Sequence, residues 1–342
     1  MIKPWIFEFF ATPAELAQQF DPKASQAYFK AYIELWASAE ALGFEGIFFS
    51  EHHFGASYSP SPNLLIAHIA PRTTKLRLGV LGMVAPYHAP WQLVEEIGML
   101  DHLTGGRLEI GTAPGIPNEM AVVGLSVDEA RARHDEAAEI IDKALLDPVI
   151  SHHGKFWNFD NLRLTPRPVQ QPHPPKWVTV VSVSSARKAA RRGAKISTAF
   201  HPQSKVIEIF DAYRDEAAKI GRHVGPDDLC LRRQVVMLDD PVQIAQRREA
   251  FREFIKFDPR VNLPGQPAAL DSPSAHAFSI GEEEFIFGGA VAVAEQIIAQ
   301  CRSAGAGHFA ALFDRMAPPA LMADYYRDFG AVTIPLLRSA AL

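Results

Sequence analysis

This chain of 342 residues has few cysteines, no excess of positive charge and no long apolar run. Its two cysteines, Cys230 and Cys301, form no C-x-x-C motif, so neither a disulfide framework nor a thiolate zinc site is predicted. Lys and Arg total 34 against 39 Asp and Glu, which leaves no global positive field to attract nucleic acid or an anionic membrane. These absences favour a reducing compartment and a small-molecule partner.

No apolar stretch approaches the roughly 18 residues that a membrane-spanning helix needs. The first apolar run, residues 5–10, is interrupted by Glu8 and is not followed by a signal-peptide cleavage site. We therefore expect a cytoplasmic protein with no membrane partner and no nucleic-acid partner. With 48% hydrophobic and 21% charged residues, the chain has enough apolar material for a large core.

Short apolar runs alternate with segments of helical period, which is typical of a parallel sheet wrapped by helices. The predicted strands, each followed by a helix, are 5–10, 46–53, 76–85, 107–113, 176–182, 196–200, 229–238 and 308–313. Eight such units close most economically as an α/β fold of the (β/α)8 TIM-barrel type, with the active site at the C-terminal ends of the strands. A doubly wound open sheet competes with this topology, but no G-x-G-x-x-G motif follows an early strand.

Two segments interrupt this rhythm within what we interpret as a single domain, 1–342. Residues 147–175 are rich in Pro and Gly and form an excursion before the fifth strand. Residues 258–284 hold four prolines with little periodicity and predict a lid-like insertion after the seventh helix.

Glu51, His52 and His53 end the second predicted strand, where barrel enzymes place their working groups. Adjacent strand residues point to opposite faces, so His52 and His53 are not expected to line one cavity while the strand stays regular. No H-x-H or H-E-x-x-H spacing is present either, and we predict no metal site. The alternative is that the two histidines only satisfy backbone carbonyls at the strand end.

Three serines, Ser182, Ser184 and Ser185, lie where the fifth strand turns into a helix. Free N–H groups and hydroxyls at such a turn can bind a phosphate, and a bound anion would offset the basic Arg187 and Lys188 near the helix start. The serines can equally be simple helix caps, and the sequence favours neither interpretation.

Glycines and aromatic residues near the strand ends give weaker signals. Gly111 and Gly115 bound the end of the fourth strand and allow a flat ligand to approach the backbone. The aromatic set of the first two strands is interpreted as barrel core in preference to a cofactor contact: Trp5, Phe7, Phe9, Phe48 and Phe49.

At this point the sequence resembles the bacterial luciferase-like flavin-dependent monooxygenases. The matching segments, which together span nearly the whole chain, are EHHF at 51–54, LRLG at 76–79, LDHLTGGRL at 100–108 leading into Gly111, HGKFW at 153–157, PRPVQ at 166–170, PHPP at 172–175 and AARRG at 189–193. The resemblance implies a barrel that binds reduced FMN, to which O2 adds to give a flavin peroxide that oxidises a small hydrophobic substrate. It also implies a separate NAD(P)H:flavin reductase as partner, and a homodimer.

Carried over by position, the resemblance makes His52 the catalytic residue beside the flavin and predicts a non-prolyl cis peptide at Leu81 and Gly82. It also assigns the three serines to phosphate binding and the 258–284 segment to a mobile loop over the flavin. The remaining candidates for cofactor contact are Phe7, Glu51, Ala113 and Gly115. Where luciferases have a cysteine and a phosphate-binding arginine, this chain has Ala113 and Pro114, so the phosphate contact must be replaced or lost.

Two other functions remain open on the same barrel. One is an oxidoreductase that uses the deazaflavin F420 for hydride transfer without O2. The other is a non-catalytic flavin-binding or partner subunit, which would have no need of His52.

Overall fold

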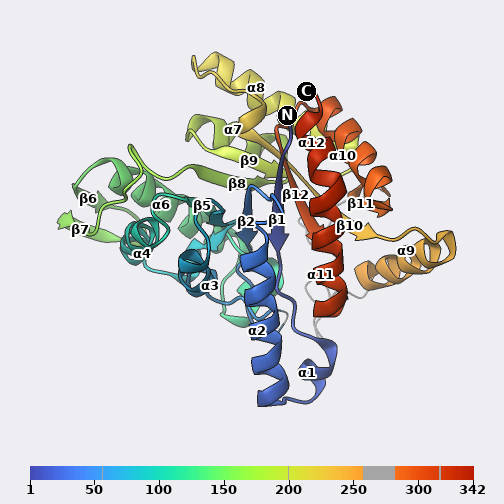
Figure 1. Ribbon diagram of the computed structural model, residues 1–342. Coiled ribbons are helices and arrows are strands. Elements are labelled where there is room, and N and C mark those ends of the chain that lie inside the picture. Colours follow the sequence, from blue (N-terminus) through green and yellow to red (C-terminus); the bar gives the residue numbers. More distant parts are fainter. Residues whose placement is uncertain (56, 199, 257–281, 316) are drawn as a thin grey trace.

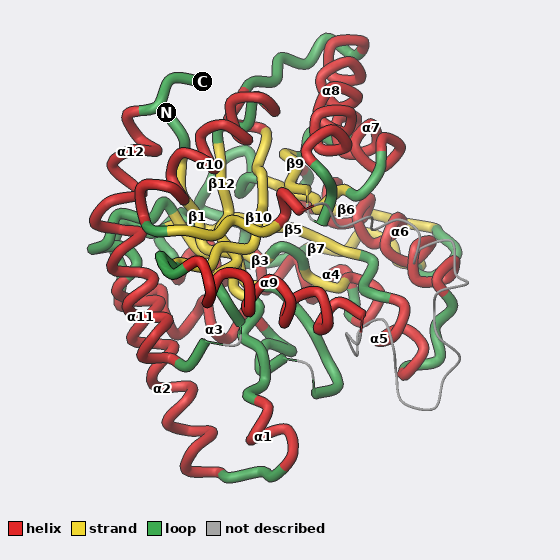
Figure 2. Tube along the Cα trace, turned by 90° about the vertical axis from the view of Figure 1, so that its right-hand side faces the viewer, coloured by secondary structure: helices red, strands yellow, loops and turns green. Residues whose placement is uncertain are grey.

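The structure is a computed structural model that describes residues 1–55, 57–198, 200–256, 282–315 and 317–342. Its centre is a ring of parallel strands that the strand pairings close. Figure 1 and Figure 2 show these strands in the middle of the molecule with helices around them. In ring order the strands are β1 (Lys3–Glu8), β2 (Gly46–Phe49), β3 (Arg77–Val80), β5 (Leu108–Ala113), β8 (Lys176–Val180), β9 (Lys195–Thr198), β10 (Leu229–Met237) and β12 (His308–Phe313). Each pairs with the next, and β12 pairs back with β1. The predicted (β/α)8 barrel is thereby confirmed.

The helices surround this ring, and most of them cover its outside. They are α1 (Ala14–Gln18), α2 (Pro22–Ser38), α3 (Pro62–Ile69), α4 (Pro90–Leu103), α5 (Pro117–Val122), α6 (Val127–Leu146), α7 (Val183–Arg191), α8 (Gln203–Lys219), α9 (Pro241–Lys256), α10 (Ala290–Ala304), α11 (Pro319–Asp328) and α12 (Ile334–Ser339). Local signals set their ends: the Asp21 side chain caps α2, and Ser126 accepts the Glu129 N–H at the start of α6. Among the described residues, none of these helices has the length and apolar character to cross a membrane.

Successive side chains of a strand point to opposite faces, so the core has one part inside the barrel and another between the barrel and the helices. Side chains from several strands fill the barrel interior, namely Trp5, Phe48, Leu81, Trp177, Cys230 and Ala310, with Phe7 packed against them. Trp5 stacks on Phe48 with ring centroids 4.4 Å apart. Phe49 points the other way and packs against Trp36 of α2 in the layer between barrel and helices. Phe7 is only partly buried and lies at the edge of the barrel interior.

Several strand boundaries differ from the prediction. The strand predicted over 46–53 ends at Phe49, so the alternation argument does not extend to the two histidines. The strand predicted over 76–85 is divided into β3 and a short β4 (Met83–Val84), with a cis peptide between Leu81 and Gly82. A further strand, β11 (Phe285–Gly288), was not predicted; it pairs with the last four residues of β10.

The segment 147–175 contains an antiparallel pair, β6 (Val149–His153) and β7 (Asn158–Arg163), that forms its own sheet apart from the barrel. Of the segment 258–284, residues 258–281 lie outside the described residues. Its last three residues, Glu282–Glu284, form a single 3-10 turn that leads into β11.

Candidate active site

The loops that follow β2, β4 and β5 meet beyond the C-terminal ends of the barrel strands. They bring together two buried carboxylates, Glu51 and Glu119, and three histidines, His52, His53 and His88. This is the end of a barrel where catalytic groups are found. We call this group the mouth cluster.

Glu51 connects the loop after β2 to the loop after β4. Its Oε1 lies 3.1 Å from Nε2 of His53 and 2.9 Å from Nε2 of His88, and its Oε2 accepts the backbone N–H of Val84 at 3.0 Å. Burial acts to raise the pKa of Glu51, but the hydrogen bonds from His53, His88 and Val84 outweigh it and lower that pKa. The hydrogen bond to Glu51 raises the pKa of His88 in turn. Glu51 is thus an ionised carboxylate whose two oxygens are both satisfied.

Glu119 binds the candidate catalytic residue, His52. The Nδ1 atom of His52 lies 3.0 Å from Glu119 Oε1, and the same oxygen accepts the backbone N–H of His53 at 3.0 Å. The His52 ring packs on Phe9, with centroids 4.5 Å apart and planes at 30°, and its backbone N–H donates to Ser59. The two histidine rings therefore bind different carboxylates, and no set of three potential metal ligands occurs in the part of the chain that the structure describes.

The backbone candidates lie around the same mouth. Gly82 follows the cis peptide, and a Cβ there would come 2.8 Å from the backbone carbon of Thr112 in β5. Gly115 has φ +89°, a left-handed conformation that suits glycine, and a Cβ there would lie 3.3 Å from the Tyr87 hydroxyl. Ala113 is the last residue of β5 and pairs with Val84 of β4. These close contacts join the ends of β4 and β5, and Val84 of β4 also donates to Glu51.

The three serines at the start of α7 divide into two roles. Ser182 and Ser185 form a capping box, with each hydroxyl bonding the other residue's backbone N–H, so the capping interpretation describes both. Ser184 is exposed in the first turn of the helix. Arg187 is exposed three residues further on, whereas Lys188 forms an ion pair with Asp135.

Sequence reasoning missed several residues of the mouth cluster and its surroundings. Glu119 and His88 carry no motif; the signal that could have found them is their place in the loops after barrel strands. A second missed group centres on Arg232 of β10. Its guanidinium lies over the rings of Phe7 and Phe200, at 5.2 and 4.2 Å, and pairs with the buried Glu284. Phe7 therefore contacts a guanidinium group as well as the barrel core.

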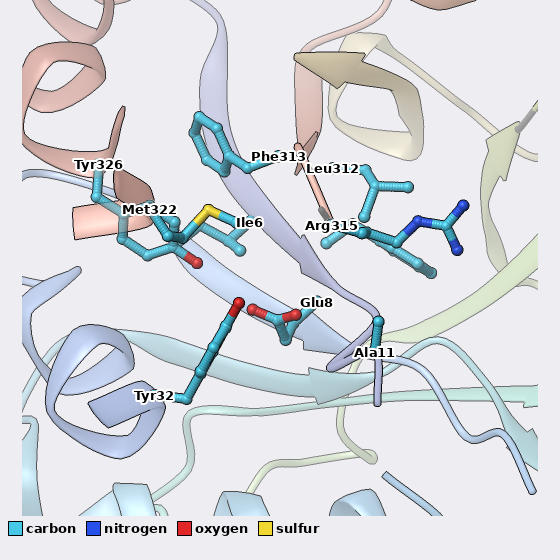
Figure 3. Close-up of a pocket in the computed structure, with 10 residues that line it drawn as sticks. Ile6, Glu8, Ala11, Tyr32, Leu312, Phe313, Arg315, Met322 and Tyr326 are labelled. Atoms are coloured by element: carbon cyan, nitrogen blue, oxygen red, sulfur yellow. The ribbon is translucent and has the colours of Figure 1, made fainter. Parts of the chain in front are cut away.

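A narrow pocket lies on the outer side of β1, between β1, β12, α2 and α11 (Figure 3). Glu8 lines it; burial raises the pKa of this carboxyl, although Trp36 Nε1 and the Phe10 N–H donate to it. Figure 3 shows the hydroxyl end of Tyr32 turned toward Glu8. Arg315 also lines the pocket and lies 4.7 Å from the centroid of the Phe9 ring, which packs on His52 of the mouth cluster.

An eight-stranded parallel barrel with buried acids and histidines beyond its strand ends has the layout of a barrel enzyme. The chain belongs to the luciferase-like monooxygenase family, whose model matches residues 10–308. It is 33% identical to the protein y4wF of Sinorhizobium fredii over 84% of this chain and 85% of that protein. It is 30% identical to the oxygenase component of a flavin-dependent trigonelline monooxygenase from Acinetobacter baylyi, over 64% of this chain and 62% of the relative.

Solved structures share the fold over nearly the full length. The monooxygenase RslO1 from Streptomyces bottropensis superposes with a TM-score of 0.81 at 24% identity, covering 98% of this chain and 99% of that one. A 3,6-diketocamphane monooxygenase from Pseudomonas putida, solved with FMN, superposes with a TM-score of 0.77 at 18% identity, covering 100% of this chain and 99% of that one. An F420-dependent secondary alcohol dehydrogenase gives 0.74 at 16% identity, covering 99% of each chain. The same barrel therefore occurs with either cofactor.

Proposed function

We propose that this protein is the oxygenase of an FMN-dependent monooxygenase system that uses O2 to oxidise a small hydrophobic organic molecule. Membership of the luciferase-like monooxygenase family supports the reaction class. The trigonelline relative is named as an oxygenase component, which supports a separate NAD(P)H:flavin reductase as the source of reduced FMN. The observation that carries the proposal is the placement of His52 beyond β2, with its Nδ1 held by the buried Glu119.

The chemistry of the mouth fits a flavin. Glu119 Oε2 and the Tyr87 hydroxyl are buried and have no hydrogen-bond partner among the residues that the structure describes. Buried polar atoms without partners are uncommon in folded proteins, and a water, an ion or a ligand can supply the partner that the protein does not. A flavin ring has N–H and C=O groups along one edge and flat apolar faces, which match these polar atoms and the neighbouring Phe9 ring. When bound, reduced FMN supplies the electrons that activate O2 for transfer of one oxygen atom to the substrate.

The protein's own residues bind, orient and exchange protons in this proposal. His52 accepts or donates a proton at the reacting centre, because imidazole is the side chain whose ordinary pKa lies near neutral pH. The backbone at Leu81, Gly82, Ala113 and Gly115 would help to hold the ring system. Glu51 fixes the loop that carries His52, through its bonds to His53 and Val84.

The phosphate would bind at the first turn of α7. Pro114 stands where related enzymes have a phosphate-binding arginine, so another cation must serve. Ser184 and Arg187 are three residues apart on α7 and share a face of the helix, whose N-terminal N–H groups favour an anion. Ser182 and Ser185 support this site indirectly by capping the helix.

The proposal is tested by anaerobic titration of the protein with photoreduced FMN, with oxidised FMN and with reduced F420. We expect reduced FMN to bind more tightly than either of the others. On admission of O2, the rate of flavin reoxidation should differ from that of free reduced FMN, and His52→Asn should remove that difference while the variant keeps its flavin affinity. Oxygen consumption and hydrogen peroxide release are followed in parallel.

The outcomes separate the two alternative functions. The F420-binding dehydrogenase of the same fold favours a hydride-transfer enzyme as the second candidate, and selective binding of F420 would establish it. Tight flavin binding with the reoxidation rate of free flavin, unaffected by His52→Asn, would instead favour a flavin-binding or partner subunit. We also propose that residues 1–342 form one domain and assemble as a homodimer in the cytoplasm; light scattering coupled to size-exclusion chromatography tests the assembly.

A further inference from the structure

Glu119 reaches the candidate catalytic histidine from a different part of the chain. It lies in α5, after β5, whereas His52 follows β2, and its side chain is only 6% exposed. Two donors converge on its Oε1 atom: the ring of His52 and the backbone N–H of His53, each at 3.0 Å. The backbone bond fixes the carboxylate relative to the same loop that carries the His52 ring.

Such an arrangement selects one form of the imidazole. A carboxylate is only an acceptor, so the ring nitrogen that faces it must carry the hydrogen. Nδ1 of His52 is that nitrogen, and the neutral ring then has its lone pair on Nε2. Contact with Phe9 at 4.5 Å and the backbone bond from His52 to Ser59 restrict the rotation of the ring.

The two carboxylates of the mouth cluster differ in how they are satisfied. Both oxygens of Glu51 have partners, as expected of a residue that only holds loops together. Glu119 Oε2 is buried and, within the described parts of the chain, accepts no hydrogen bond. The Tyr87 hydroxyl is likewise buried without a hydrogen-bond partner among the described residues. Burial raises the pKa of Tyr87, and the negative charges of Glu119 and Glu51 raise it further. An unsatisfied carboxylate oxygen is costly in a purely structural role.

We propose that Glu119 is a positioning residue that holds His52 as the Nδ1–H tautomer, so that Nε2 is the atom that takes up a proton, and that the Glu119 carboxylate then stabilises the positive ring. This inference takes from the proposed function only the role of His52 at the reacting centre. A carboxylate that orients a histidine in this way contributes through the histidine's tautomer and charge.

The first test uses the protein without any flavin. In the wild-type protein with 15N-labelled histidine, long-range 1H–15N correlation spectra report which ring nitrogen of His52 carries hydrogen, and the His52→Asn variant identifies the signals. We expect a protonated Nδ1 and an unprotonated Nε2 above the titration range of the ring. An Nε2–H tautomer in the wild-type protein would overturn the inference, and this measurement needs no substitution of Glu119.

The second test uses Glu119→Gln with Asp160→Asn as the matched control. A glutamine amide can donate as well as accept, so we expect the His52 signals to shift toward a mixture of tautomers. Asp160 binds His153 at 3.0 Å in an exposed pair on the β6–β7 hairpin, so its substitution changes a carboxylate–histidine contact away from the mouth and should leave the His52 signals unchanged. Unaltered His52 signals in Glu119→Gln would contradict the proposal.

Flavin-loaded protein provides the third readout. Glu119→Gln should slow the O2-dependent reaction about 10- to 100-fold with little change in reduced-FMN affinity, and Glu119→Asp should recover part of the loss. A ten-fold loss of FMN affinity with an unchanged His52 tautomer would show that Glu119 acts through the cofactor alone, and would overturn its positioning role. Failure of wild-type protein to bind reduced FMN would overturn the proposed function alone, because the tautomer is measured without flavin.

Discussion

We expect the largest loss of stability when the carboxylate of Glu284 is replaced by an amide. It is fully buried; its Oε1 lies 3.1 Å from Arg232, and its Oε2 lies 3.1 Å from both Arg233 and the backbone N of Phe200. Glu284→Gln keeps the shape but leaves two guanidinium groups, 4% and 0% exposed, without this negative charge. Removing one partner of a buried ion pair costs about 3–5 kcal/mol, because the remaining charge stays desolvated.

Urea unfolding followed by tryptophan fluorescence measures this loss. The control is Asp324→Asn, which removes an exposed pair with Arg327 at 2.9 Å and should cost less than about 1 kcal/mol. The slope of the free energy of unfolding against urea should stay the same in both variants, since neither changes the surface exposed on unfolding. If Glu284→Gln lowers the free energy of unfolding no more than the control does, the ion pairs of Glu284 with Arg232 and Arg233 do not stabilise the contact between β10 and the start of β11.

Three further changes test other parts of the structure. The pKa of Glu40 is lowered to about 2, because hydrogen bonds from the backbone N–H groups of 74–76 and the Thr74 hydroxyl outweigh burial. Stability should therefore fall as pH drops from about 4.5 toward 2, and Glu40→Gln should flatten this dependence by roughly 1–2 kcal/mol in urea unfolding at a series of pH values. Ser184→Asp should weaken reduced-FMN binding about ten-fold and leave riboflavin binding unchanged in fluorescence titrations, because a carboxylate repels the phosphate but suits the first turn of a helix; equal losses for both flavins would place the phosphate elsewhere. Gly98→Ala should destabilise the protein by about 1–3 kcal/mol in thermal unfolding, despite alanine's better helix propensity, since its Cβ would lie 2.0 Å from the Pro166 carbonyl oxygen.

The barrel could be predicted because its strands are buried on both faces and therefore appear as short apolar runs in the sequence. All nine residues of β10 are buried, for example. The strand β11 could not be found in this way. It follows three consecutive glutamates at the end of a proline-rich segment, and it pairs with β10 only beyond the point where β9 ends. That pairing depends on the length of a neighbouring strand, which local sequence does not encode.

The candidate site was predictable where position in a barrel unit was enough. His52 and Glu51 directly follow a strand, and the cis peptide expected from the family resemblance occurs at Leu81 and Gly82. Glu119 has no such signal, because it meets His52 only when the barrel closes and brings the loops after β2 and β5 together. The serines before α7 illustrate a different limit: the same residue types cap helices and bind phosphate, so only coordinates assign Ser182 and Ser185 to the cap.

Both oxygens of Glu51 accept hydrogen bonds within the mouth cluster, whereas among the described residues only Oε1 of Glu119 does. The loop after β2 is irregular, with Phe54 at φ +61°, so its backbone and histidines depend on side-chain acceptors for their hydrogen bonds. Glu51 binds His53 of this loop with Oε1 and the backbone N–H of Val84 in β4 with Oε2, whereas Glu119 binds the loop with Oε1. A ligand that donates a hydrogen bond to the buried Oε2 binds only the folded protein and therefore stabilises the folded state. Reduced flavin should therefore raise the unfolding temperature of the wild-type protein more than that of Glu119→Ala, whose side chain offers the flavin no acceptor.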